Sequence, residues 1–157
     1  MNLPAQTKTR KGFTLIELLV VIGVLAVLLT IVLIAINPAR QFSQSNDTKR
    51  RSDVNALLNA VHQYAADHRG VLPGGAEITT GVVVVNSTTA PILCTDLVSD
   101  YLAALPVDPQ TNNGLPVASC SGAAWNTNYT ISRSAANSRI TVSAPGGELD
   151  ANISVTR

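Results

Sequence analysis

The stretch Gly12-Phe13-Thr14-Leu15-Ile16-Glu17, followed directly by the apolar run Leu18–Ile36, decides how this chain is organised. Together they give about 24 residues whose only formal charge is that of Glu17. A helix needs roughly 20 apolar residues to cross a bilayer, so the run predicts a membrane-spanning helix. A carboxylate near the centre of a span costs about 2.5–3.5 kcal/mol on insertion scales and by default indicates a functional partner. We therefore expect Glu17 to meet a cation.

The length and charge of the chain limit the remaining possibilities. Of the 157 residues, about 120 follow the apolar run, which suits a single modest domain. Lys8, Arg10 and Lys11 precede the run, so the net charge of +1 hides eight basic and ten acidic side chains after residue 12. Nothing in this distribution indicates nucleic-acid binding.

The order of the first segments differs from that of a secretory signal. Residues 1–12 are polar and basic, and the apolar run follows them, so a cut at Gly12 would leave the span on the mature chain. Counting Lys and Arg on the two sides gives a near tie, because Arg40 and the run 49–51 follow the span. The charges of residues 8–11 lie closer to the apolar boundary, which favours an amino terminus inside the cell.

The region after the span reads as a second, amphipathic helix. Asn37-Pro38 predicts an end or a kink, because proline cannot donate the helical hydrogen bond. Beyond a polar patch at 43–47, spacings of three and four predict one apolar helix face that stops near Arg69-Gly70. The residues of that face are Val54, Leu57, Leu58, Val61, Tyr64 and Ala65.

Polar residues of the same segment are expected to face water. The spacing predicts an ion pair between Asp47 and Arg51, one turn apart. The run Lys49-Arg50-Arg51 is interpreted as a solvated face, with contact to lipid headgroups or to an acidic neighbour in an assembly as the alternative. His62 and His68 are interpreted as solvated side chains.

Residues 70–157 predict a small β-rich region. We expect a loop at 71–81, a β-branched strand at 82–85, and a short helix that starts at Thr95 or Asp96 and ends before Pro106. A long loop over 107–124 follows. Segments around residues 129–131, 140–144 and 153–155 alternate apolar and polar side chains, which predicts an antiparallel sheet with one buried face and short connections at 135–138 and 145–147.

Cys94 and Cys120 favour a disulfide, because the region is rich in Ser, Thr, Asn and Gly and offers a thin core. Closing a loop of about 25 residues would contribute roughly 3–4 kcal/mol in the chain-entropy model. Two unrelated buried thiols are the alternative. The chain has no Cys-x-x-Cys spacing, and His62 and His68 lie on another segment, so we expect no metal and no cofactor.

Taken together, the basic leader, the Gly12 to Glu17 motif, the apolar helix and its amphipathic continuation resemble type IV pilins and type II secretion pseudopilins. The resemblance covers about the first 70 residues, and the rest only in layout. It implies an α+β, pilin-like fold with a long N-terminal helix packed on a small antiparallel sheet. Its parts would be a leader at 1–12, a membrane and assembly helix at 13–36, an amphipathic continuation at 37–69 and a globular β-domain at 70–157.

The resemblance also implies roles for three residues. A prepilin peptidase would cut between Gly12 and Phe13 and methylate the new amino group of Phe13. Glu17, one turn further on, would pair with the Phe13 amino group of a neighbouring subunit in a filament. The partners implied are this peptidase, other copies or related pilin subunits, and an inner-membrane assembly platform. The location implied is the cytoplasmic membrane, and then a filament on the cell surface or in the periplasm.

Leu105-Pro106-Val107-Asp108-Pro109 resembles part of a loop motif of major pseudopilins that precedes a calcium site there. Asp108, Asn112 and Asn113 offer oxygen ligands. Gln110 and its neighbours stand where that family usually has an aromatic-glycine pair, and a proline-bounded turn is the preferred interpretation.

Two further functions compete with the structural filament subunit. One is a membrane-tethered sensor or ligand-binding protein whose helix serves only as an anchor. The other, ranked third, is an anchored hydrolase, although the sequence has no nucleophile motif or carboxylate pair at an informative spacing. We therefore expect no enzymatic activity.

Overall fold

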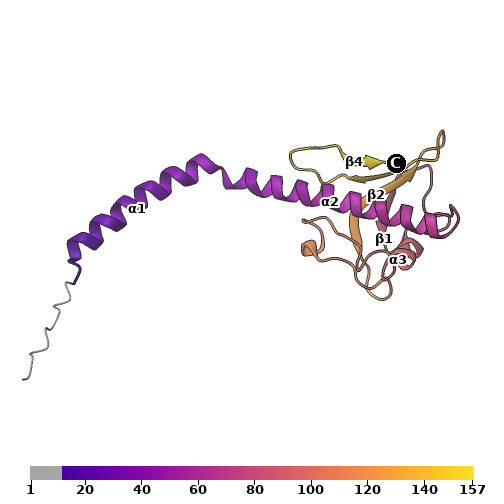
Figure 1. Cartoon of the computed structure of the whole chain (residues 1–157), viewed down its shortest axis with the longest axis horizontal. Coiled ribbons are helices and arrows are strands. Elements are labelled where there is room, and N and C mark those ends of the chain that lie inside the picture. Colours follow the sequence, from indigo (N-terminus) through magenta and orange to yellow (C-terminus); the bar gives the residue numbers. More distant parts are fainter. Residues whose placement is uncertain (1–11) are drawn as a thin grey trace, which may run out of the picture. The chain divides into compact units, whose positions relative to one another are not determined.

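The computed structural model describes residues 12–157, in which the chain divides into two compact units between Gln41 and Phe42. The described part of the first unit contains helix α1 (Leu15–Ile36) and the start of helix α2 (Pro38–Asp67) (Figure 1). The second unit contains the rest of α2 and the following elements: β1 (Val83–Asn86), α3 (Pro91–Leu97), the short 3-10 helix η1 (Asn112–Gly114), β2 (Asn126–Arg133), β3 (Ile140–Ala144) and β4 (Ile153–Thr156).

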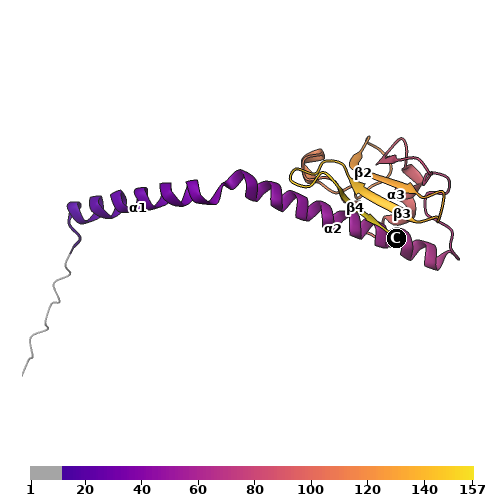
Figure 2. The same ribbon diagram turned by 90° about the horizontal axis from the view of Figure 1, so that it is seen from above.

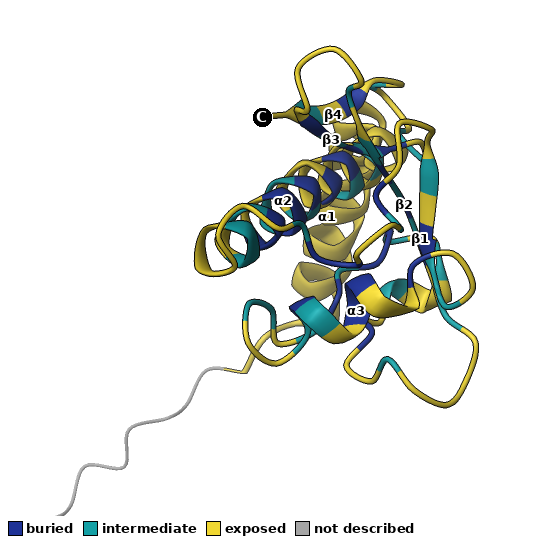
Figure 3. Cartoon of the chain, turned by 90° about the vertical axis from the view of Figure 1, so that its right-hand side faces the viewer, coloured by how far each residue is buried: buried dark blue, intermediate teal, exposed yellow. Residues whose placement is uncertain are grey.

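Helix α1 ends where the sequence predicts an interruption. Asn37 adopts a left-handed conformation with φ 46° and ψ 78°, which stops the helix after Ile36. Pro38 then opens α2, at a position where its missing N–H costs no helical hydrogen bond. No residue of α1 is buried, and Figure 3 shows the whole helix in the colour of exposed residues.

The second unit is built on the predicted apolar face of α2. Val54, Leu57, Leu58 and Val61 are almost completely buried in a core that strands β1 to β4 complete. Figure 2 shows α2 running alongside the sheet. The helix ends at Asp67, and the N–H of Gly70, at φ 88°, then donates to the Ala65 carbonyl oxygen at 2.7 Å. The expected stop at this glycine is confirmed.

The four strands form one antiparallel sheet in the order β1-β2-β3-β4. Alternate residues of β2 and β3 are buried, among them Tyr129, Ile131, Ile140 and Val142, and the residues between them are at least partly exposed. The pairing of Ile131 with Val142 puts both on the buried face. The prediction of an α+β fold with a small antiparallel sheet is therefore confirmed.

The short helix in the long loop region is displaced from its prediction. Helix α3 begins at Pro91 and ends at Leu97, several residues earlier than expected. The reason is a cap supplied from a distant loop: the Glu77 carboxylate accepts from the N–H groups of Ile92 and Leu93 at 2.9 and 2.7 Å. Thr95 and Asp96 therefore lie inside the helix and do not begin it.

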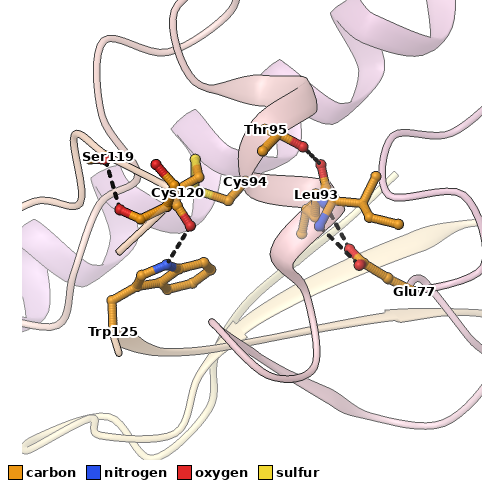
Figure 4. Close-up of a disulfide and its surroundings, with 9 residues drawn as sticks. Glu77, Leu93, Cys94, Thr95, Ser119, Cys120 and Trp125 are labelled. Atoms are coloured by element: carbon orange, nitrogen blue, oxygen red, sulfur yellow. Dashed lines mark hydrogen bonds between the residues drawn. A yellow bond between two sulfur atoms is a disulfide. The ribbon is translucent and has the colours of Figure 1, made fainter. Parts of the chain in front are cut away.

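The expected disulfide between Cys94 and Cys120 is present, with the two Cα atoms 5.7 Å apart. Figure 4 shows how it ties α3 to the loop that precedes β2. The Trp125 indole N–H donates to the Cys120 carbonyl oxygen at 3.4 Å. The disulfide thus attaches this long loop to the core at a point where the loop itself has few apolar side chains.

Candidate functional site

The motif Gly12 to Glu17 forms the amino-terminal cap of α1. Thr14 has an extended backbone and is the N-cap residue, and Glu17 occupies the third helical position. The Thr14 hydroxyl accepts from the Glu17 N–H at 3.3 Å, and the Glu17 carboxylate accepts from the Thr14 N–H at 2.8 Å and from its hydroxyl at 2.7 Å. These reciprocal bonds make a capping box, which satisfies helix N–H groups that otherwise lack partners.

The capping box leaves Glu17 accessible to a partner. Both residues of the box are exposed, and Phe13 just before it is 86% exposed. Among residues 12–157, the structure gives Glu17 no ion pair. The negative carboxylate therefore stands at the start of the helix, one turn from Phe13, where residues 12–157 supply hydrogen bonds but no cation.

Helix α1 presents an apolar surface on every side. With its 22 residues, the helix is long and apolar enough to cross a membrane. Its backbone groups bond within the helix, so only the side chains need an apolar environment. A helix with this composition suits a bilayer or the centre of a helical assembly.

The capping box was missed from the sequence, although its signal is present. A threonine followed three residues later by glutamate, just before an apolar run, is a recognised helix-start pattern. The interpretation of Glu17 as an acid waiting for a cation passed over this local role. The structure adds the hydrogen bonds that orient the carboxylate before any partner arrives.

A second charged group, the Arg50 cluster, consists of Asp47, Arg50, Asp108 and Glu148 and lies inside the second unit. The Arg50 side chain is 0% exposed. It donates to Asp108 through Nε at 2.7 Å and through a terminal nitrogen at 3.2 Å, to Asp47 at 2.8 Å and to Glu148 at 3.0 Å. One guanidinium thus joins α2 to two loops that lie about 60 and 100 residues further along the chain.

The electrostatics of the Arg50 cluster favour its charged form. Burial alone would raise the pKa of Asp47, but hydrogen bonds from the backbone N–H groups of residues 148–150 and from Arg50 lower that pKa to about 2. The hydrogen bonds to Asp108 raise the pKa of Arg50 above its usual value despite burial. The cluster is therefore a satisfied ionic network that holds three segments together.

Two predictions about this segment are wrong. Asp47 pairs with Arg50 at 2.8 Å and not with Arg51, which instead pairs with Asp150 at 2.9 Å on the surface. The run 49–51 is not a solvated face throughout, because Arg50 is completely buried. The signal was available in the sequence: Asp47 and Arg50 lie seven and four residues before Val54, on the helix face that carries the apolar residues.

The loop interpreted by resemblance to a calcium motif belongs to the same cluster. Both oxygens of Asp108 accept from Arg50, and one also accepts from the Gln110 N–H at 2.9 Å. Asn112 and Asn113 are exposed in η1. Within residues 12–157 no group of three or more His, Cys, Asp or Glu side chains could hold a metal ion. The cation that Asp108 binds is the guanidinium of Arg50.

The two histidines differ from each other. His68 is exposed, its ring stacks on Tyr64 with centroids 3.9 Å apart, and the prediction of a solvated side chain is confirmed. His62 is only partly exposed, and its Nε2 atom is buried without a hydrogen-bond partner in the part of the chain that the structure describes. The prediction of a solvated side chain is wrong for that atom, because it is buried.

Comparison with known proteins bears on the capping box at the start of α1. The searches of curated proteins and of solved structures found no match to this chain. One family model matches, and it covers the segment that contains the capping box and most of α1. Residues 7–33 carry the prokaryotic N-terminal methylation motif, which is the signature of type IV pilin and pseudopilin precursors.

Proposed function

We propose that this chain is the precursor of a structural, non-catalytic subunit of a type IV pilus or a type II secretion pseudopilus. The match of residues 7–33 to the methylation motif carries the proposal. The uniformly exposed apolar surface of α1 supports it, because such a surface needs lipid before assembly and neighbouring helices afterwards. The subunit would lie in the cytoplasmic membrane first and then in an extracytoplasmic filament.

Processing is proposed at the bond between Gly12 and Phe13, with methylation of the new Phe13 amino group by a prepilin peptidase. Both residues are exposed and precede the first turn of α1. A Cβ atom at Gly12 would meet no other atom within 4 Å, so the fold itself does not require glycine there. The requirement for glycine would come from the peptidase, whose active site must admit the chain at the bond that it cuts.

Mass spectrometry of chain produced with and without a prepilin peptidase tests the processing step. We expect peptidase-dependent loss of residues 1–12 and one added methyl group on Phe13. The variant Gly12→Val should stay uncut while its circular dichroism remains that of the parent chain. A chain that keeps residues 1–12 in the presence of active peptidase, or a cut chain without the methyl group, would contradict this step.

Assembly is proposed to depend on the Glu17 carboxylate and the Phe13 amino group of the next subunit. Pairing two charges away from water offsets the cost of desolvation only when the geometry is good, so the pair would mainly set the register between subunits. The capping box supports this role, because hydrogen bonds from Thr14 hold the carboxylate at the helix start. Assembly then proceeds through unlike surfaces and builds an open helical filament.

The capping box also offers a competing explanation for a requirement for Glu17, namely that it only caps the helix. A pair of variants separates capping from pairing between subunits. Glu17→Gln removes the charge, whereas Thr14→Val removes the hydroxyl bonds of the box and keeps the carboxylate. In cells with an assembly platform we expect sheared filaments to disappear with Glu17→Gln and to persist with Thr14→Val. Equal loss in both variants would assign Glu17 to helix capping alone. Normal filaments with Glu17→Gln would favour a membrane-tethered sensor or ligand-binding protein.

A further inference from the structure

A solvent-open depression of about 420 Å³ lies at the end of the second unit where α2 stops. It is formed by the turn that follows α2 and by the connection between β2 and β3, which Figures 1 and 2 both show at the same end of this unit. The lining residues are Gly70, Val71, Leu72, Gly75, Arg133 and Ser138. Neither the predicted processing nor the predicted assembly uses these residues.

The lining offers hydrogen-bond donors that the fold leaves unused. Arg133 is exposed, and its guanidinium makes no hydrogen bond or ion pair within residues 12–157. The hydroxyl of Ser138 and the backbone N–H groups of Leu72 and Gly75 likewise have no partner in that range. Gly75 has φ 55°, and a Cβ atom there would meet nothing within 4 Å, so its backbone is open to approach.

Three acids lie close to the lining residues, in sequence or through a hydrogen bond, and each already has a donor. Asp67, three residues before Gly70, accepts from the Tyr101 hydroxyl at 3.0 Å. Asp96 accepts from the Gly74 N–H at 2.8 Å, and Glu77 accepts from the start of α3. The carbonyl oxygens of Tyr64 and Ala65 at the end of α2 accept from the turn that follows. None of the lining residues is acidic. The depression therefore presents donors to solvent, and the acids around it, Asp67, Glu77 and Asp96, each already accept a hydrogen bond.

Two more arginines stand next to the lining. Arg69 precedes Gly70 and Arg139 follows Ser138, so each has its Cα atom about 3.8 Å from that of a lining residue. Both are exposed, and neither forms an ion pair in the described part of the chain, where the paired cations are Lys49, Arg50 and Arg51. Segments 67–77 and 132–139 together contain three arginines and two acids, Asp67 and Glu77, which leaves a net charge of +1.

We propose that this depression binds an oxyanion, namely a phosphate or sulfate group. The fork of an arginine guanidinium matches the oxygens of such groups, and unpaired backbone N–H groups near glycine turns form anion-binding concavities. Arg133 is the principal ligand, Ser138 and the turn N–H groups complete the contacts, and Arg69 and Arg139 raise the local positive potential. The site does not depend on filament formation.

Titration of the full chain in maltoside micelles with inorganic phosphate and with sulfate tests the site. Proton–nitrogen correlation spectra are recorded while sodium chloride keeps the ionic strength constant. We expect saturable shifts confined to the amide signals of residues 70–72, 74, 75 and 138. Arg133→Gln should weaken binding roughly tenfold, as expected when a hydrogen bond to a charged group is lost. Arg40→Gln, which removes an exposed and unpaired arginine elsewhere, should leave the affinity unchanged.

Polyphosphate distinguishes a free ion from a group carried on a polymer. Binding per phosphate that is much tighter than that of the free ion would assign the site to a polymer, through multivalent contact, and equal binding would assign it to the free ion. Either result supports an oxyanion site. Shifts that do not saturate, that sodium chloride reproduces, or that persist unchanged in Arg133→Gln would overturn the proposal.

Discussion

Helix α1 and the Phe42–Asp67 part of α2 follow each other in the chain but differ in what their side chains contact. In α1 every residue is exposed, including all its leucines, isoleucines and valines. In α2 the far more polar sequence buries seven residues, two of them charged. Burial within one chain therefore follows the periodicity of apolar residues and not their number, because a helix packs one face on a sheet and cannot bury its whole circumference in a small domain.

The acids of the two helices, Glu17 and Asp47, also differ in exposure. The Glu17 carboxylate is exposed, and within residues 12–157 its only hydrogen-bond partner is Thr14, so it stays available to a second molecule. Asp47 is 2% exposed and accepts from Arg50 and from three backbone N–H groups of the 145–152 connection. A short-range cap leaves an acid accessible, whereas long-range partners enclose it.

Breaking the Arg50 cluster should have the largest effect on the second unit. Arg50→Met removes the cation and leaves Asp47 and Asp108 buried, which should lower the free energy of unfolding by about 3–5 kcal/mol. Urea unfolding of the full chain in micelles, followed by the fluorescence of Trp125, measures this loss. Arg51→Met breaks only the exposed pair with Asp150 and should cost less than about 1 kcal/mol. Equal losses in the two variants would show that burial of Arg50 does not matter.

Removing the disulfide should come next. The double variant Cys94→Ala, Cys120→Ala frees a loop with a sequence separation of 26 residues. The chain-entropy model gives a loss of about 3–4 kcal/mol, measured in the same unfolding experiment. Because α1 has no part in the bridge, its helical signal in micelles should remain after the second unit has unfolded. A simultaneous loss of both signals would contradict the independence of the two units.

One matched leucine substitution in each helix tests the contrast directly. Leu58→Ala empties a completely buried position in α2 and should cost about 2–4 kcal/mol of unfolding free energy. Leu25→Ala in α1 changes a side chain that is 52% exposed and should leave the unfolding of the second unit unchanged within about 0.5 kcal/mol. If Leu25→Ala destabilises the second unit as much as Leu58→Ala does, the two helices do not differ in the way described.

The smallest expected effect is a pH dependence from Asp47. Its pKa in the folded chain is about 2, below its value in the unfolded chain, so the folded state binds the proton less readily. The ionised acid therefore stabilises the fold above about pH 4, and this contribution is lost as the pH falls from about 4 to about 2. Unfolding measured at pH 5 and at pH 2.5 should show the loss, and Asp47→Asn should show less of it. The same slope in both chains would contradict the role of Asp47.

Local patterns in the sequence predicted much of the fold. Three features were predicted from residues no more than four positions apart, because they depend only on neighbouring side chains. They are the interruption at Asn37-Pro38, the apolar face from Val54 to Val61 and the alternation in β2 to β4. The start of α3 was misplaced because its cap comes from Glu77, 15 residues away from Ile92. The ion pair of Asp47 was misassigned although its partner Arg50 is only three residues away, because the prediction considered the spacing of four and not the helix face that carries the apolar residues.

The sequence by itself therefore determined the apolar span, the motif Gly12 to Glu17, the amphipathic face of α2 and the choice of an antiparallel sheet, since each is written in contiguous residues. Only the tertiary structure decided that Asp108 and Glu148 surround Arg50, and that the turn after α2 meets the connection between β2 and β3 around Arg133. Those outcomes depend on which distant segments meet, and that follows from packing of the whole domain around its core.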